Sequence, residues 1–337
     1  MARDPGSNRN IVICYDGTGN EYGDTNTNVV RTFQEIVRDG KQVAFYDPGV
    51  GTFSYLGRKI GRRVGTVLGQ AFGLGLVENL EDAYEYLMNT HVPGDNLYIF
   101  GFSRGAFQAR VLADYVHKMG VLQKGSRNLI PYVTKLYFNE RRPDVINGFR
   151  QTYCHNCSTH FLGVWDTVAS LGHFFGRQFS SNILNADVKY AFQAAAIDEK
   201  RKKFPLSLWD ESRSPPNQKM EQVWFAGVHS DIGGGYAERG LPDIAMAWLV
   251  GKAESEAGLR MREGWRDRLP CNPLGQMHES RAGFWKLWQP VVREVPEGSK
   301  VHYSVKQRMD DPRLGYVPKL PANFTWVDEP DDGPDTG

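Results

Sequence analysis

Several features that would place this chain in a specific class of protein are absent from its sequence. It has 4 cysteines in 337 residues, too few for the disulfide framework that stabilises small secreted domains. It has no run of about 18 or more apolar residues, which excludes a membrane-spanning helix, and residues 1–9 are polar and lack the apolar part of a secretory signal. We therefore expect a cytoplasmic protein, or one exported by a machine that reads no N-terminal signal.

An excess of charge of either sign is also missing. The 40 Lys and Arg residues and 39 Asp and Glu residues give a formal net charge of +1. Binding to the phosphates of a nucleic acid needs a basic excess on at least one face, so the balance argues against nucleic acid as the main partner. The short basic stretches at 58–63 and 200–203 are typical of solvated surface. The 41% hydrophobic content is enough for a large core, which predicts a folded chain.

Short apolar runs alternate with segments of helical periodicity along most of the chain. This alternation predicts an α/β fold whose mostly parallel sheet has helices on both faces. The predicted strands are 11–15, 42–46, 96–100, 160–165 and 222–228, and the predicted helices are 27–37 with Asn28 as a possible N-cap, 76–89, 106–118, 129–148, 188–198 and 242–257. The predicted organisation is a polar tail (1–9), the α/β core (10–257), a C-terminal extension packed on the core (258–327) and a disordered acidic tail (328–337).

Reactive polar residues follow four of the five predicted strands. They are Asp16, Ser103, Asp166 and His229, while the fifth strand ends in a polar turn at Asp47. In parallel α/β sheets, function is concentrated in the loops at the carboxyl ends of the strands. We therefore expect these four side chains to lie at one edge of the sheet.

Residues 101–105, with the sequence GFSRG, fit the pattern G-x-S-x-G between a predicted strand and a predicted helix. This is the context of a nucleophile elbow, the sharp turn of α/β-hydrolases that exposes a serine above the sheet. The flanking glycines remove side chains that would clash in so tight a turn. The pattern predicts an α/β-hydrolase-like fold with Ser103 as the nucleophile, and an ordinary glycine-rich turn is the alternative.

A serine nucleophile needs a base to accept its proton and an acid to orient the base. On an α/β-hydrolase sheet these residues follow the serine in the order acid, then histidine, and Asp166 and His229 supply that order. His302 is the rival for the base. Asp231, two residues after His229, is expected to brace the histidine loop.

An acyl-transfer site also needs two hydrogen-bond donors for the oxyanion. The backbone N–H of Arg104, the residue after the nucleophile, is one candidate. The second is expected from the loop after the first strand, where the N–H of Gly17 or Thr18 can approach closely. Asp16 is then expected to hold that loop by accepting hydrogen bonds.

Other interpretations of the motifs are weaker. Cys154 and Cys157 form a CxxC, but a structural zinc site normally needs two more ligands of similar spacing. The segment Asp16-Gly17-Thr18 is reminiscent of the D-x-D-G-T motif of aspartyl phosphotransferases, yet Cys14 occupies the position of the nucleophilic aspartate. Neither a metal nor a cofactor is predicted. A rival of another class is a binding module that keeps the fold without catalysis.

A set of segments, in the right order, resembles the α/β-hydrolase family typified by the catalytic domain of type VI secretion phospholipase effectors. They are YDGTGN (15–20), NVVR (28–31), YDPGVGT (46–52), IFGFSRGAFQAR (99–110), FLGVWDTVAS (161–170) and WFAGVHSDIGGGY (224–236), and VHYSVKQR (301–308) resembles the family's final motif. The resemblance implies a Ser103–Asp166–His229 triad and esterase or phospholipase chemistry.

Aromatic and apolar residues are frequent in two loops after predicted strands, at Phe53, Tyr55 and Leu56 and at Phe174 and Phe175. Such side chains suit an acyl group beside a polar reacting centre. We therefore expect hydrolysis of carboxylic esters, with lipid or phospholipid esters as the leading substrate class and small soluble esters second.

Overall fold

The computed structural model describes residues 8–17, 23, 25–49, 66–168, 182–281 and 289–329, with the backbone alone for 66–74. The strands are β1 (Asn10–Tyr15), β2 (Gln42–Asp47), β3 (Asn96–Phe102), β4 (Val121–Leu122), β5 (Cys154–His155), β6 (Thr159–Trp165), β7 (Tyr190–Ala196), β8 (Lys219–Phe225), β9 (Ser299–His302) and β10 (Phe324–Val327). The helices are α1 (Asn28–Glu35), α2 (Thr66–Thr90), α3 (Arg104–Met119), α4 (Ile130–Asn139), α5 (Pro143–Tyr153), α6 (His229–Gly233), α7 (Gly240–Ser255) and α8 (Tyr303–Asp310). None of these helices is long and apolar enough to cross a membrane.

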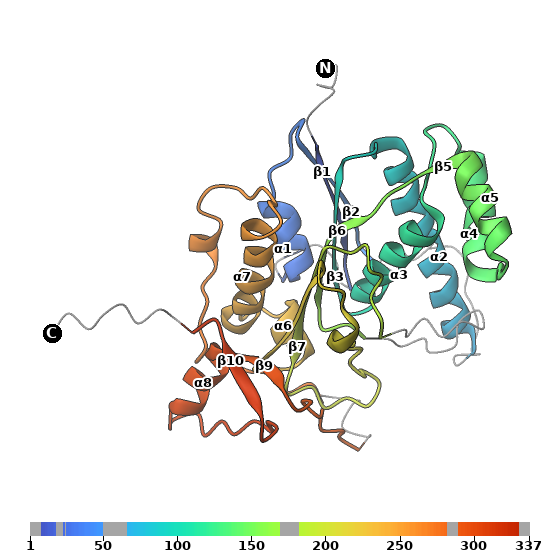
Figure 1. Ribbon diagram of the computed structural model, residues 1–337. Helices are drawn as coiled ribbons and strands as arrows, with labels where there is room; N and C mark the ends of the chain where they lie inside the picture. The colour runs from blue at the N-terminus through green and yellow to red at the C-terminus, as the bar shows by residue number, and fades with distance from the viewer. Residues whose placement is uncertain are drawn as a thin grey trace.

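Eight of the described strands form one sheet in the order β10-β9-β8-β7-β6-β3-β1-β2, and every neighbouring pair is parallel. β3 and β6 lie side by side near the middle of the sheet (Figure 1). The predicted fold class, a mostly parallel sheet with helices on both faces, is confirmed. All carboxyl ends therefore meet at one edge of the sheet.

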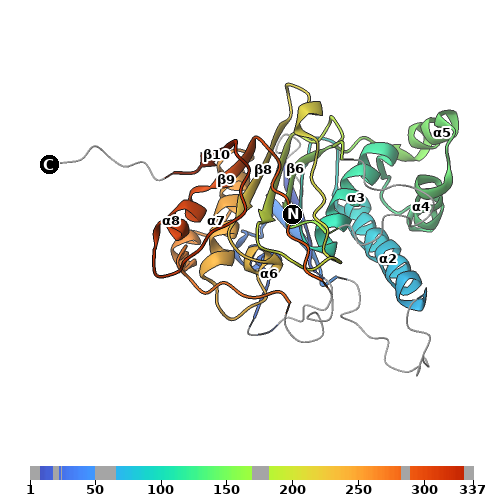
Figure 2. The same cartoon turned by 90° about the horizontal axis from the view of Figure 1, so that it is seen from below.

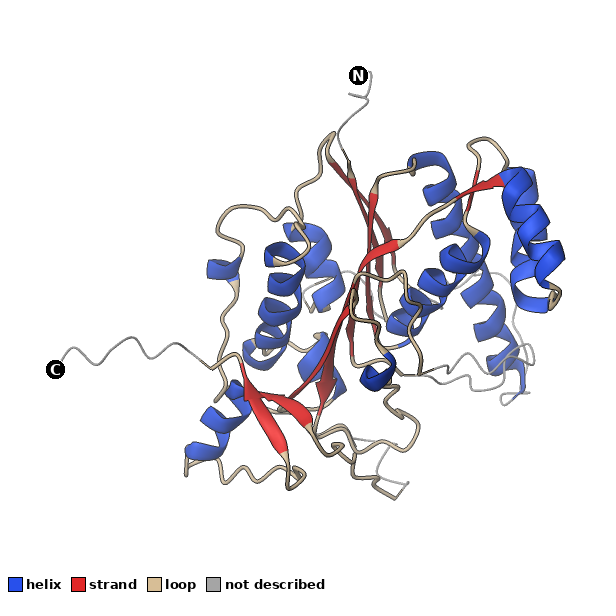
Figure 3. Ribbon diagram, in the orientation of Figure 1, coloured by secondary structure: helices blue, strands red, loops and turns tan. Residues whose placement is uncertain are grey.

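The two faces of the sheet are covered by different helices. Successive residues of β1 alternate between the two hydrophobic clusters: Ile11 and Ile13 pack with α2, α3 and α4, whereas Val12 and Cys14 pack with α1 and α7. Figures 2 and 3 show the sheet between these two groups of helices. Burial on both faces explains why the central strands are continuous apolar runs.

The prediction of a helix over 188–198 is wrong, because this segment contains β7. Its alanines favour a helix by intrinsic propensity. In the folded protein, β7 instead forms hydrogen bonds with β6 on one side and β8 on the other, and tertiary pairing outweighs the local preference.

Two smaller predictions also need correction. The helix expected over 129–148 is two helices, α4 and α5. They separate before Pro143, because a proline disfavours helical backbone in the preceding residue. The N-cap of α1 is Thr27, whose hydroxyl accepts from the Val30 N–H, and Asn28 is the first helical residue.

The segment after residue 258 extends the sheet by β9 and β10. These short strands share a hydrophobic cluster with β7 and β8 that includes Ala195, Trp224 and Val301. Beyond β10, Asp328 forms an ion pair with Lys252 of α7 at 3.6 Å. Residues 330–337, most of the predicted disordered tail, lie outside the described residues, and the predicted domain boundaries stay predictions.

Candidate active site

Ser103 occupies a sharp turn between β3 and α3. Its backbone has φ 59° and ψ −119°, a conformation that residues other than glycine rarely adopt. The flanking glycines are required by close backbone approach: a Cβ on Gly101 would lie 2.4 Å from the Gly105 carbonyl oxygen, and a Cβ on Gly105 would lie 2.3 Å from the Tyr15 carbonyl oxygen. The sequence pattern G-x-S-x-G therefore reflects sterics that the fold imposes.

The register of the sheet places Asp166 beside Ser103. Phe102 pairs with Trp165 at the ends of β3 and β6, so the next residue of each strand reaches the same edge. The Ser103 N–H donates to the Trp165 carbonyl at 3.1 Å, and the Asp166 N–H donates to the Ala194 carbonyl of β7 at 2.8 Å. Asp166 also has a positive φ of 42°. Both residues thus follow their strands with a positive φ, which residues other than glycine rarely adopt.

His229 joins the two side chains in one hydrogen-bonded chain. Its Nε2 lies 2.8 Å from Ser103 Oγ, and its Nδ1 lies 2.6 Å from Asp166 Oδ2. The exposed fractions are 8% for Ser103, 4% for His229 and 0% for Asp166. His229 begins α6, and three residues separate it from the end of β8. The structure therefore brings together the three residues that the sequence proposed as a triad.

Two aromatic rings hold the imidazole in place. The Phe102 ring lies against it at a centroid distance of 4.6 Å, and the Phe204 ring meets it edge-on at 5.0 Å. A Cβ on Gly233 would lie 2.0 Å from the Phe102 ring, so the glycine leaves room for that ring. The backbone N–H of His229 donates to Glu199 Oε2 at 3.3 Å. These contacts leave the ring little freedom to rotate away from Ser103.

A residue that the sequence analysis did not single out also contacts the acid. Arg293 donates from both terminal nitrogens to the two oxygens of Asp166, at 2.6 and 2.9 Å. Burial alone would raise the pKa of the Asp166 carboxyl, but Arg293 and then His229 hold that pKa well below its usual range. Burial lowers the pKa of His229, and its bond to Asp166 opposes the shift. A neutral imidazole beside an ionised carboxylate can accept a hydroxyl proton.

The loop after β1 lies beside this turn, as the approach of Gly105 to the Tyr15 and Asp16 carbonyls shows. Asp16 accepts hydrogen bonds from the hydroxyls of Thr27 and Tyr46, each at 2.9 Å, and from the Gly17 N–H at 2.6 Å. Its carboxylate thus ties the end of β1 to α1 and β2. Thr18 lies outside the described residues. Arg104 is the first residue of α3, so its backbone N–H belongs to the positive end of the helix dipole.

Asp231 lies in the same short helix as His229 and is fully buried. Its Oδ2 accepts from the backbone N–H groups of Val228 and His278, at 3.0 and 3.1 Å, and its Oδ1 lies 2.7 Å from His278 Nδ1. A Cβ on Gly227 would meet the Asp231 Cβ at 2.5 Å. The carboxylate therefore fixes the backbone on the N-terminal side of His229.

The rival histidine has a different environment. His302 ends β9, its Nδ1 bonds to Ser304 Oγ at 2.8 Å, and its ring stacks on Phe225. Burial lowers the pKa of His302 to about 4. Its side chain contacts its own segment and the sheet, whereas Ser103 bonds to His229.

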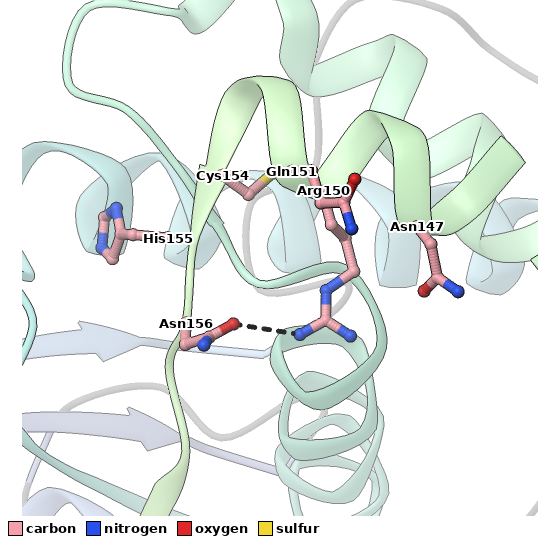
Figure 4. Close-up of a pocket in the computed structure, with 6 residues that line it drawn as sticks. All are labelled: Asn147, Arg150, Gln151, Cys154, His155 and Asn156. Atoms are coloured by element: carbon pink, nitrogen blue, oxygen red, sulfur yellow. Dashed lines mark hydrogen bonds between the residues drawn. The ribbon is translucent and has the colours of Figure 1, made fainter. Parts of the chain in front are cut away.

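The CxxC segment lies at the other end of the sheet, because Cys154 and Cys157 precede β6 and Asp166 follows it. Both thiols are free, and burial raises the pKa of Cys154 to about 11. A cavity of about 370 Å³ opens here (Figure 4), lined by Asn147, Arg150, Gln151, Cys154, His155 and Asn156. Throughout the described ranges, no group of three or more His, Cys, Asp or Glu residues is placed to hold a metal ion.

The aromatic residues used to predict an acyl site, Phe53, Tyr55, Leu56, Phe174 and Phe175, lie outside the described residues. The structure instead adds Arg293 to the site. Nothing in the local sequence distinguishes this arginine, because it belongs to an irregular segment 127 positions after Asp166. Only the folded chain shows that the two residues meet.

This chain is similar to a protein family, to a yeast protein and to a solved structure. Residues 9–252 match the family model described as "T6SS, Phospholipase effector Tle1-like, catalytic domain". The uncharacterized protein YEL023C of Saccharomyces cerevisiae is 30% identical over 220 residues, which cover 59% of this chain and 32% of the yeast protein. This chain thus spans about a third of the length of that relative. A crystal structure of an uncharacterized protein from Pseudomonas aeruginosa matches with a TM-score of 0.46 and 21% identity, covering 77% of this chain and 47% of that one.

Proposed function

The chain belongs to the family of Tle1-like phospholipase effector catalytic domains, and from this membership we propose that it is a serine hydrolase of carboxylic esters. The observation that supports the proposal most strongly is the continuous hydrogen-bonded chain Ser103–His229–Asp166, with distances of 2.8 and 2.6 Å. Nucleophile, base and orienting acid are the three groups that acyl transfer through a serine requires.

In the proposed reaction, Ser103 Oγ attacks the ester carbonyl while His229 Nε2 accepts the hydroxyl proton. The tetrahedral intermediate collapses, the ester C–O bond breaks, and the alcohol leaves with the proton from His229. Water then attacks the acyl-enzyme with His229 as the base, and the carboxylic acid leaves as Ser103 regains its proton. Asp166 keeps the imidazole in the tautomer with its proton on Nδ1 and stabilises the imidazolium that forms.

The developing oxyanion needs donors that are already in place. We assign one to the backbone N–H of Arg104, at the start of α3. Of the two candidates in the first loop, Thr18 is the stronger, because the Gly17 N–H is engaged with Asp16 at 2.6 Å. In this proposal, Asp16 and Asp231 are supporting residues that fix the backbone on either side of the reacting groups.

The preferred substrates in this proposal are lipid or phospholipid esters. The family description names a phospholipase effector, and the apolar residues that follow β2 and β6 in the sequence are of a kind that suits an acyl chain. The alternative is an α/β-hydrolase-fold binding module without activity. A buried serine in a strained conformation beside a neutral His229 and an ionised Asp166 favours the enzyme, because such strain is stored mainly at functional sites.

The test is Ser103→Ala, assayed on p-nitrophenyl esters of increasing acyl length and on phospholipid vesicles. Losing the nucleophile of such a triad reduces turnover on the order of 10⁶-fold, so we expect activity to fall to background. Wild-type protein should also be labelled by a fluorophosphonate probe, and the variant should not. His302→Gln is the matched control and should retain both properties. More than a few per cent of activity in Ser103→Ala, or no labelling of the wild type, would contradict the proposal.

A further inference from the structure

The Asp166 carboxylate forms hydrogen bonds with four donor groups. Its Oδ1 accepts from the Ala196 N–H at 2.9 Å and from Arg293 at 2.6 Å, and its Oδ2 lies 2.6 Å from His229 and 2.9 Å from Arg293. The guanidinium meets the carboxylate with two parallel bonds, the geometry that gives arginine–carboxylate pairs both strength and a fixed orientation. The plane of the carboxylate that holds His229 is thus set by Arg293.

Arg293 is itself held firmly. Its two terminal nitrogens also donate to the carbonyls of Ala196 and Phe204, each at 3.0 Å, and the side chain is 8% exposed. It comes from the segment before β9, outside the range 9–252 that matches the family model. The C-terminal part of the chain therefore inserts a buried cation behind the acid of the site.

We propose that Arg293 is a positioning residue that orients Asp166 and, by neutralising its carboxylate, sets the pH at which the Asp166–His229 pair takes up a proton. As a statement about catalysis this rests on the proposed function. A buried carboxylate without a cation has a high affinity for protons, and a protonated Asp166 would no longer hold the imidazole in the required tautomer. With Arg293 in place, the carboxylate stays ionised and the imidazole stays neutral over a wider range of pH.

Two further charged residues, Glu199 and Arg201, affect the proton affinity of the Asp166–His229 pair. Glu199 contacts the His229 backbone and favours the imidazolium, but Arg201 forms two bonds to Glu199 at 2.9 Å and offsets its charge. Arg293 and Glu199 thus act on the pair from the described part of the chain, and Arg201 acts through its bonds to Glu199. Because Arg293 is the cation in direct contact, its removal raises the proton affinity of the pair, whichever member takes up the proton.

The test uses two neutral variants, Arg293→Gln and Arg293→Met, and one charged variant, Arg293→Lys. The control is Arg308→Gln, which removes another buried arginine of the C-terminal part of the chain, one that lies in α8 and donates to the carbonyls of Pro273 and Gly275 instead. Urea unfolding establishes that each variant is folded. The apolar Met variant is included because it places no unpaired amide beside Asp166.

The primary measurement is the titration of His229, followed through its ring nitrogens by NMR in protein labelled with ¹⁵N-histidine. We expect the midpoint to rise by about one pH unit or more in the Gln and Met variants, by less in Arg293→Lys, and not at all in Arg308→Gln. An unchanged midpoint in both neutral variants would overturn the proposal.

The pH profile of fluorophosphonate labelling provides the catalytic readout. The acid limb of the labelling rate should move to higher pH in Arg293→Gln. On a p-nitrophenyl ester at the optimum pH, Arg293→Lys should show a lower kcat with little change in KM. If the NMR midpoint moves but the wild-type protein is not labelled at any pH, the proposed hydrolysis fails while the control of the pair by Arg293 stands. If labelling occurs and neither the acid limb of the labelling rate nor the titration midpoint of His229 moves, the proposed hydrolysis is supported and Arg293 has only a structural role.

Discussion

The backbone of Ser103 offers a test of strain that is independent of activity. Replacing Ser103 by Gly and, separately, by Ala removes the hydroxyl in both variants, so the lost 2.8 Å bond to His229 cancels in the comparison. A residue with a Cβ in this conformation, with φ 59° and ψ −119°, is destabilised by about 1–3 kcal/mol. Glycine is free of that strain but loses about 0.5–1 kcal/mol through its more flexible unfolded state. Ser103→Gly should therefore be the more stable of the two by about 1 kcal/mol.

The assay is urea unfolding followed by tryptophan fluorescence. The free energies of unfolding are compared with the same m-value, the slope of that free energy against urea concentration, for both variants. The control is Ala247→Gly in the middle of α7, where ordinary helical backbone makes glycine less stable than alanine by about 1 kcal/mol. The two Ala-to-Gly comparisons should thus have opposite signs. If glycine at 103 is less stable than alanine there, as it is expected to be at 247, the turn is not strained and the steric account of the motif is wrong.

Two further predictions concern the strand ends around the site. Gly105→Ala places a Cβ 2.3 Å from the Tyr15 carbonyl oxygen, so urea unfolding should show a loss of about 1–3 kcal/mol, with reduced fluorophosphonate labelling. Gly148→Ala in α5 adds a Cβ that meets no atom within 4 Å beyond its own helix backbone and chain neighbours, so it should gain about 0.5–1 kcal/mol. Equal effects of the two substitutions would contradict the steric argument. Burial raises the pKa of Asp47 to about 6, so the stability that its protonation contributes is complete below pH about 4 and is lost as the pH rises through about 6. Asp47→Asn should therefore flatten the pH dependence of stability in this range and increase stability at pH 8. A steeper pH dependence in the variant would refute the predicted direction of the effect.

The proximity of Ser103, Asp166 and His229 could be predicted because each follows a strand of one parallel sheet. Such strands deliver their next residues to the same edge, so local patterns and chain order were enough. The fold class was predictable from the alternation of strands and helices, and the family from the ordered segments that resemble it; both are confirmed. Thr18 and the aromatic loop residues lie in segments that the structure does not describe, and their proposed roles stay predictions.

Other parts of the molecule were not predictable from local patterns. β7 has the composition of a helix and becomes a strand only because it fills the gap between β6 and β8. β9 and β10 have four residues each, too few for a clear periodicity. Arg293 makes its contacts through tertiary structure alone. Each of these features depends on distant segments meeting, which neither propensity nor spacing encodes.

Because the residues of the site are far apart in the sequence, the complete site can form only late in the synthesis of the chain. Ser103, Asp166, His229 and Arg293 leave the ribosome in that order, and 190 positions separate the first from the last, since 293 − 103 = 190. At a synthesis rate of about 5–20 residues per second, this interval lasts roughly 10–40 s. During that time the nascent chain contains Ser103 without His229, and then Asp166 and His229 without Arg293. The bonds that link Ser103, His229, Asp166 and Arg293 can therefore form only after most of the chain has been made.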